Sequence, residues 1–295
     1  VQRLRKSKDP SMMYLIGNPT HDTLSINKNT VQALGGTVWY AALFLTGLGR
    51  RVAVVGTGDA EIKRRLARRG VDVRHFSDAG SVTVFENTYS AGIRKQRAWA
   101  GGDIHPADVP QAAFDAPGLL IGPVLQEVDP AIMRTPRSGC LMLDAQGFLR
   151  QISTAGDVIL RMTPEAETAL RHCDVLKVDA REAAVITSTG DIETAGRLLY
   201  RMGPKLVIIT RGRDGACIYD GASFTQVTAP EVDVVDPTGA GDVFSAAFLV
   251  RHIATGNLVA AGRFAVTAAA LSTRGFGASA LPSEAEISSL MKRHF

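Results

Sequence analysis

The segment spanning residues 235–244 carries the residue types in this chain best suited to chemistry. It reads Val-Asp-Pro-Thr-Gly-Ala-Gly-Asp-Val-Phe and runs into a strongly helical stretch at 245–250. Its small residues Gly239, Ala240 and Gly241 expose backbone N–H groups at the start of that helix. Unpaired donors and the positive end of the helix dipole attract an anion there. The segment therefore predicts a phosphate-binding anion hole at a helix N-terminus.

Asp242 falls in the first turn of the same helix, beside the anion that the loop would hold. A carboxylate in this place can accept the proton of an attacking hydroxyl, while the amides stabilise charge on a transferring phosphoryl group. The simpler alternative is a glycine-rich turn with an acid that stabilises the helix. The chain contains no Gly-Lys dipeptide and no G-x-G-x-x-G string, which excludes two other common phosphate motifs.

The string at 236–244 resembles the C-terminal signature of the ribokinase-like (PfkB) carbohydrate kinases. This resemblance implies that Asp242 is the catalytic base and that residues 239–241 form the anion hole. It further implies an ATP-dependent phosphotransferase that uses Mg²⁺ and has a doubly wound α/β fold.

The N-terminal part of the chain resembles the same family at a second place. Gly35 and Gly36 precede a helix, as does the di-glycine that borders the substrate in the family, and Asp22 falls where the family has a hydroxyl-binding aspartate. A carboxylate that accepts two hydroxyl hydrogen bonds is a common way to hold a polyol. The alternative for Asp22 is a turn-forming residue.

The resemblance also assigns a nucleotide-binding region. The stretch 179–182 is similar to the family's Asn-x-x-Glu element, whose glutamate helps to organise Mg²⁺ and the phosphates indirectly. Asp replaces Asn in this chain, so the expectation rests on Glu182, whose alternative role is an exposed helix acid. Thr210, Gly212 and Gly215 match a nucleotide-binding turn at the end of a strand.

Three further positions complete the implied donor region. Gly277 lies in the loop that follows the helix flanking adenine in the family. Asp236 and Thr238 correspond to positions that contribute to a monovalent-cation site, such as one for K⁺, in several members. Their alternative role is turn formation.

The identity of the acceptor depends on local strings. Tyr40 stands where ribokinases usually have Asn, which argues against a plain ribokinase. Strings at 17–22, 83–86 and 144–150 are similar to a subgroup that contains plant-type myo-inositol kinases. We therefore expect a sugar or cyclic polyol as acceptor, with myo-inositol as the first compound to test. The contacts expected from these strings are made by Asn18, Gln146 and Arg150.

Other functions stay open at this point. A nucleoside or a sugar phosphate could be the acceptor of a kinase of the same family, and aromatic residues such as Trp39 and Phe85 could stack on a base. A catalytically silent member that binds a sugar or regulates a partner is the non-enzyme alternative. The intact Asp242 argues against it.

The elements that must position these residues follow from the hydrophobic pattern. Short apolar runs alternate with helical segments, which is typical of a doubly wound, mainly parallel sheet covered by helices on both faces. The runs expected to form strands lie at 13–17, 52–55, 119–121, 141–143, 175–178 and 206–209.

One stretch breaks the alternation. Residues 81–100 read as strands without an intervening helix, and with 22–34 they are expected to form a small β lid. An ordinary hairpin at the edge of the sheet is the alternative. We expect one domain over 1–295 and consider a homodimer formed through the lid.

Composition limits the other classes of function. The chain has 295 residues, a net charge of +4 and a basic cluster at 63–69. At helical spacing this cluster predicts a solvated helix face and not a nucleic-acid site. There is no apolar run long enough for a membrane span, and the three cysteines are scattered. The sequence thus predicts a cytoplasmic protein that binds neither membranes nor nucleic acids.

Overall fold

The computed structural model describes residues 12–26, 29–78, 80–90 and 93–295 and is built on a nine-stranded sheet. The strand order is β15-β14-β13-β12-β9-β8-β1-β4-β5, parallel except where β13, β14 and β15 pair. The strands are β1 Met12–Ile16, β4 Arg51–Thr57, β5 Asp72–Ser77, β8 Gly118–Ile121, β9 Cys140–Asp144, β12 Val175–Asp179, β13 Leu206–Thr210, β14 Ala216–Tyr219 and β15 Phe224–Val227.

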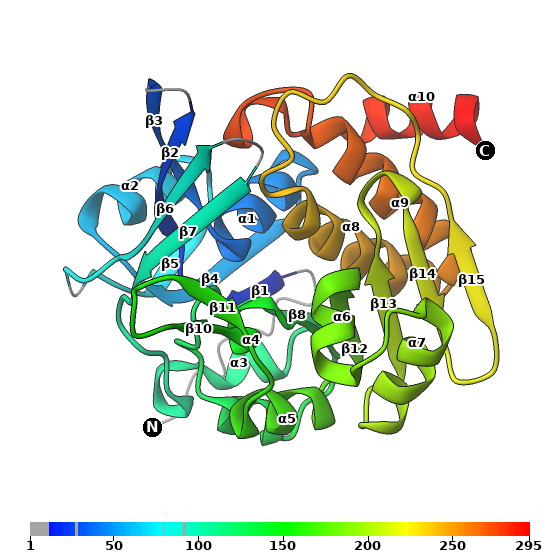
Figure 1. Cartoon of the computed structure of the whole chain (residues 1–295), viewed down its shortest axis with the longest axis horizontal. Helices are drawn as coiled ribbons and strands as arrows, with labels where there is room; N and C mark the ends of the chain where they lie inside the picture. The colour runs from blue at the N-terminus through cyan, green and yellow to red at the C-terminus, as the bar shows by residue number, and fades with distance from the viewer. Residues whose placement is uncertain (1–11, 27–28, 79, 91–92) are drawn as a thin grey trace, which may run out of the picture.

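Helices cover both faces of this sheet because its strands are apolar on both sides. In β1, Met13 and Leu15 pack into one core, whereas Tyr14 and Ile16 pack into the other. The first core is closed by α1 Thr37–Gly47, α2 Ala60–Arg68, α8 Ala240–Thr255, α9 Leu258–Ser272 and α10 Glu284–His294. The second is closed by α3 Gln111–Phe114, α4 Gln146–Leu149, α5 Pro164–Arg171, α6 Ala180–Thr187 and α7 Ile192–Arg201. The predicted doubly wound fold is confirmed (Figure 1).

A separate four-stranded sheet, drawn in blue to cyan in Figure 1, lies to one side of the main sheet. Its order is β3-β2-β6-β7, with β2 parallel to β6 and the outer pairs antiparallel. The strands are β2 Thr20–Ile26, β3 Asn29–Gly35, β6 Thr83–Ser90 and β7 Ile93–Trp99. The predicted second sheet is thus confirmed. Residues 27–28 and 91–92 of the expected lid, and 1–11 of the expected domain, lie outside the described residues.

One boundary differs from the sequence prediction. The expected lid segment begins at residue 22, with a turn as the alternative for Asp22, but β2 already begins at Thr20. Strand pairing with both β3 and β6 extends this segment, because each backbone group there finds a ladder partner. Asp22 therefore sits on a strand of the small sheet and not on a flexible turn.

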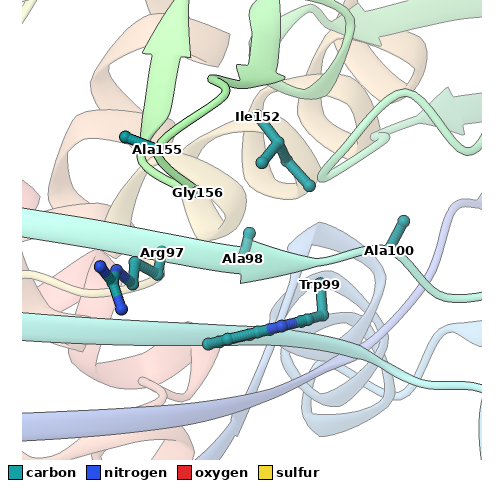
Figure 2. A pocket seen from close by; sticks show the side chains of 7 residues that line it. All are labelled: Arg97, Ala98, Trp99, Ala100, Ile152, Ala155 and Gly156. Atoms are coloured by element: carbon teal, nitrogen blue, oxygen red, sulfur yellow. The ribbon is translucent and has the colours of Figure 1, made fainter.

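A short hairpin, β10 Arg150–Ile152 and β11 Val158–Leu160, connects the small sheet to the main body. An isolated bridge pairs Arg97 of β7 with Asp157 of the hairpin. A pocket of about 410 Å³ lies at this junction, lined by Arg97, Ala98, Trp99, Ala100, Ile152, Ala155 and Gly156 (Figure 2). None of these residues belongs to the predicted site.

The basic cluster lies on α2, as the helical spacing indicates. Ile62 and Leu66 are fully buried, whereas Arg64, Arg65 and Arg68 are exposed. Across the described ranges, the helices are all too short or too polar to cross a membrane.

Candidate active site

The loop before α8 has the shape of an anion hole. Gly239 caps the helix with a left-handed backbone (φ 81°), which other residues adopt only at a cost. A side chain at this position would also collide with the ring of Tyr40, whose atoms lie 2.5 Å from a Cβ built on Gly239. The amide of Val243 donates to the carbonyl of Gly239 at 2.9 Å, so the amides of the residues before Val243 in this turn have no acceptor within the helix. That of Ala240 donates to the carbonyl of Pro237 at 3.3 Å. Only glycine at 239 allows this arrangement.

Asp242 lies in that first turn and is buried. Its Oδ1 accepts hydrogen bonds from Thr37 Oγ1 at 2.8 Å and from Gln146 Nε2 at 3.2 Å. Among the described residues no donor is bonded to the second oxygen, Oδ2. One oxygen of the carboxylate is thus fixed by the protein, and the other is left to accept a proton.

The surroundings of Asp242 adjust its basicity. Burial raises the pKa of this carboxyl to about 6, and the negative charge of Asp144 adds to the effect. The ammonium of Lys177 and the hydrogen bond from Thr37 act in the opposite direction. A group with this pKa is ionised at neutral pH but holds a proton much more readily than an ordinary aspartate. That property suits a general base.

Gln146 is the first residue of α4 and contacts Asp242, and Arg150 caps the C-terminal end of the same helix. Gln146 donates to Thr37 Oγ1 at 2.8 Å as well as to Asp242, and its Oε1 accepts from Arg150 at 2.8 Å. The guanidinium of Arg150 also stacks on the ring of Phe85, 5.3 Å from its centroid. Arg150 therefore fixes the orientation of the Gln146 amide and links it to strand β6 of the small sheet.

The expected acceptor residues meet where β2, β3 and α1 join. Thr20 Oγ1 donates to Asp22 Oδ1 at 2.7 Å, and a Cβ built on Gly35 would lie 2.2 Å from Asp22 Oδ2. The glycine thus leaves space for the carboxylate. Gly36 begins α1 with φ 89°, and a Cβ there would lie 2.6 Å from the carbonyl oxygen of Asn18. Both glycines are required by close approach of the chain.

Asn18 is placed differently from the other expected acceptor contacts. It has no exposed surface, its Nδ2 donates to the carbonyl of Gly102 at 2.7 Å, and its Oδ1 accepts from the amide of Thr57 at 2.8 Å. The backbone N–H of Asn18 donates to the buried carboxylate of Glu127 at 3.0 Å. The side chain of Asn18 ties three segments together and presents no free polar atom to a ligand.

Glu182 is buried, which excludes the alternative of an exposed helix acid. It forms a capping box with Asp179 at the start of α6, in which each side chain accepts from the other's amide, at 2.8 and 2.7 Å. Asp at 179 therefore serves as a helix cap. Burial raises the pKa of Glu182 to about 7, while Lys177 opposes this effect.

Glu182 is the carboxylate that the sequence assigned to Mg²⁺, and a single carboxylate fits an ion bound mainly through phosphate and water. The described residues hold no cluster of three His, Cys, Asp or Glu side chains that could form a cage for a metal. Mg²⁺ in kinases keeps several waters and one or two carboxylates. Glu182, 5% exposed, fits a contact made through water.

The turn after β13 contains Thr210, Gly212 and Gly215. Thr210 Oγ1 donates to the carbonyl of Val178 at 3.4 Å, which joins β13 to β12. Both glycines have a positive φ, but a Cβ on Gly212 would meet open space, whereas one on Gly215 would lie 1.9 Å from the carbonyl of Val227. Gly215 is required by the close approach of the chain in this turn, whereas at Gly212 only the positive φ favours glycine.

The side chain of Asp236 links two other predicted residues, Thr238 and Gly277. The carboxylate of Asp236 accepts from the amide of Thr238 at 2.9 Å and from the amide of Gly277 at 3.0 Å. Asp236 thus fastens the loop after α9 to the anion-hole loop. Each of its oxygens accepts one backbone amide, as in the turn-forming alternative for this residue.

Sequence reasoning missed three residues of this site: Thr37, Asp144 and Lys177. Lys177 is a buried ammonium, and its Nζ lies 3.0 Å from Asp144 Oδ2. A lysine between the apolar residues of strand β12 was the available signal, since an unpaired charge does not remain in a core. Thr37 follows Gly36 directly but carries no pattern of its own.

Comparisons with known proteins agree with this geometry. The family described as pfkB family carbohydrate kinase matches residues 142–285. Inositol 3-kinase of Oryza sativa subsp. japonica is 35% identical over 261 residues, which is 79% of this chain and 61% of that enzyme. The chain thus spans less than two thirds of that relative's length. A nucleoside kinase of Methanothermobacter thermautotrophicus is 27% identical and covers 84% of this chain and 80% of that enzyme.

A solved structure is similar over a longer range. It is a pyrophosphate-dependent kinase in the ribokinase family, complexed with a pyrophosphate analog and myo-inositol. It has a TM-score of 0.82 and 25% identity, covering 94% of this chain and 99% of that one. This chain has the ribokinase fold. Its residues 142–285, just under half of the chain, match the pfkB family of carbohydrate kinases, which the motifs of this region resemble.

Proposed function

We propose that this chain transfers the γ-phosphoryl group of ATP to a hydroxyl of a sugar or cyclic polyol, with myo-inositol as the first acceptor. The observation that carries this proposal is the placement of Asp242. Its Oδ1 is held by Thr37 and Gln146, and the residue lies in the first turn of α8, at the N-terminus of that helix. A base and an anion site within one helical turn are what phosphoryl transfer to a hydroxyl requires.

In this reaction Oδ2 of Asp242 accepts the proton of the acceptor hydroxyl as its oxygen attacks the γ-phosphorus. The bond from phosphorus to the β,γ-bridging oxygen breaks, and ADP leaves with that oxygen. The amides of Gly239 and Gly241 stabilise the charge on the transferring group, and the amide of Ala240 joins them by releasing the carbonyl of Pro237, to which it donates at 3.3 Å. Mg²⁺ would neutralise phosphate charge when bound, and Glu182 is the residue that would help to hold it. K⁺ near Asp236 and Thr238 would act through the backbone of the loop, since both carboxylate oxygens of Asp236 are already used.

On the acceptor side, Asp22 binds hydroxyl groups of the substrate through charge-assisted hydrogen bonds. Tyr40 is buried against Gly239 and fills the volume where a smaller side chain would leave space for a different ring. Gln146 and Arg150 complete this side, next to the base. The similarity to an inositol 3-kinase and to a kinase solved with myo-inositol supports a cyclic polyol.

On the donor side, Thr210, Gly212, Gly215 and Gly277 border ATP in this proposal. The apolar side chain of Phe276 is 61% exposed next to Gly277 and offers a surface for a base. The small sheet acts as a lid over the acceptor, within one kinase domain, and could pair with a second copy to form a homodimer. Three free cysteines are consistent with work in the cytoplasm.

The test is a matrix of donors and acceptors with one readout, phosphorylated product detected by mass spectrometry. ATP and pyrophosphate serve as donors, and myo-inositol, ribose, fructose, fructose 6-phosphate and nucleosides serve as acceptors. We expect product with ATP and myo-inositol. Turnover of nucleosides with myo-inositol inert would replace the polyol by a nucleoside, as in the relative from Methanothermobacter. Product with pyrophosphate but not ATP would replace the donor.

A further inference from the structure

A buried ion pair lies next to the proposed base. Nζ of Lys177, in the middle of β12, is 3.0 Å from Oδ2 of Asp144, at the end of β9. The side chains are 6% and 0% exposed. Ser245 Oγ donates to the same carboxylate oxygen at 2.9 Å, whereas Asp144 Oδ1 is buried without a partner. A fully buried pair with an unsatisfied oxygen costs stability, so its presence needs a reason.

The position of the pair supplies that reason. A Cβ built on Gly241 would lie 2.9 Å from Nζ of Lys177, so the ammonium lies directly against the anion-hole glycine. Ser245 also donates to the carbonyl of Gly241 at 3.1 Å and therefore connects Asp144 to the helical turn that carries Asp242. The pair thus adjoins the helical turn that carries Asp242, directly at Gly241 and through Ser245.

The charged groups around Asp242 show why an ammonium is needed beside it. The titratable and charged groups that face Asp242 from the neighbouring elements are Asp144, Lys177, Arg150 and Tyr40, with Glu182 facing Lys177 from α6. Two of these five, Asp144 and Glu182, are acids near the buried carboxylate or near its ammonium. Tyr40 is a neutral phenol whose pKa is raised by burial and by the carboxylates of Asp242, Asp22 and Asp236. An ionised base in such a place requires a nearby cation.

We propose that the Asp144–Lys177 pair is the electrostatic partner of Asp242: Lys177 keeps the base ionised in its buried site, and Asp144 holds the ammonium against Gly241. Both are positioning residues, since they act through Asp242 and the anion hole. The inference rests on the proposed function for its meaning, because a base needs to be ionised only if it accepts a proton. The electrostatic coupling itself can be measured without turnover.

The two members of the pair act on the base in opposite directions. Asp144 raises the pKa of Asp242 and Lys177 lowers it, while burial is the largest influence on that carboxyl. Burial opposes the charge of Lys177 too, but the carboxylates of Asp144, Glu182 and Asp242 outweigh it and raise the pKa of the ammonium. Lys177 is therefore charged over the whole range in which Asp242 titrates.

The experiment uses three variants of the full chain: Lys177→Met, Asp144→Asn and the double variant. The carboxyl-carbon NMR signal of Asp242, assigned by its loss in Asp242→Asn, is titrated in each. We expect Lys177→Met to raise the pKa of Asp242 by about 1 unit or more, and Asp144→Asn to lower it. The double variant should return close to wild type, since it removes one charge of each sign.

A purely structural pair predicts otherwise: all variants that fold would titrate Asp242 as wild type does, and that result overturns the inference. If Lys177→Met does not fold, Asp144→Asn and the double variant still decide. Asp144→Asn should lower the pKa of Asp242, whereas the double variant should leave it close to the wild-type value. The acid limb of kcat/KM should move with the NMR titration. If the titration shifts as expected but no acceptor is phosphorylated, the proposed function fails and the coupling stands.

Discussion

Asp242→Asn separates the chemistry of the site from its architecture. The substitution keeps the volume and an oxygen that can accept from Thr37 and Gln146, so the local hydrogen bonds survive. It removes only proton acceptance. General-base contributions are about 10²- to 10⁴-fold, and we expect kcat to fall by that factor.

Although kcat should fall, the free energy of unfolding of Asp242→Asn at pH 8 should not fall with it. Burial raises the pKa of Asp242 from 3.8 to about 6. A raised pKa contributes stability that is fully present below pH 3.8 and is lost as the pH rises through about 6. At about 1.4 kcal/mol per pH unit, ionising this carboxyl costs the folded state on the order of 2–3 kcal/mol at pH 8. The Asn variant does not carry this cost, so its melting temperature at pH 8 should equal or exceed that of wild type.

The assay measures ADP release with myo-inositol and ATP, together with thermal unfolding at pH 5 and pH 8. Asp191→Asn is the matched control, because Asp191 caps the exposed start of α7 by accepting from Thr194. It should lower stability slightly and leave kcat unchanged. An Asp242→Asn variant with more than about half of wild-type kcat would refute the assigned role. A large loss of stability at pH 8 would show that the residue is structural.

The other predictions concern the acceptor, the metal, the pH range and the amide behind the base. Asp22→Ala should lower kcat/KM for the acceptor at least about tenfold with ATP binding unchanged, measured by kinetics and calorimetry; lower stability with normal kinetics would indicate a structural aspartate. Excess chelator should abolish turnover, and Glu182→Gln should raise the Mg²⁺ concentration needed for half-maximal rate. The value of kcat/KM should fall below pH of about 6, as Asp242 gains a proton. Arg150→Lys should lower kcat about tenfold, because a lysine cannot both hold Gln146 and stack on a ring; an unchanged kcat in stopped assays would contradict this.

The parts that could be predicted from sequence are those fixed by local backbone chemistry. The alternation of apolar runs and helices predicted the main sheet, since strands buried on both faces must be apolar throughout. The helix N-terminus at 239–242 was predictable because small residues such as glycine at the start of a helix leave its backbone amides accessible. The stretch 81–100 was predicted as strands because its pattern offers no apolar helical face.

The parts that could not be predicted depend on contacts between distant segments. Thr37 and Asp242 are 205 positions apart and meet only because α1 and α8 pack on the same face of the sheet. The amide of Asn18 was expected to reach a substrate, but long-range bonds to Gly102 and Thr57 use it instead. The strand start at Thr20 was missed because pairing with β3 and β6 extended a segment whose own residues favour a turn.

The most direct test of the central claim is whether phosphorus moves from ATP to a polyol in a way that depends on Asp242. Purified protein is incubated with myo-inositol, Mg²⁺ and ATP carrying a labelled γ-phosphate, and the products are separated by chromatography. The geometry predicts labelled inositol monophosphate with the wild-type chain and at least about a hundredfold less with Asp242→Asn. Equal amounts of labelled product from both proteins, or label released only as inorganic phosphate, would contradict it.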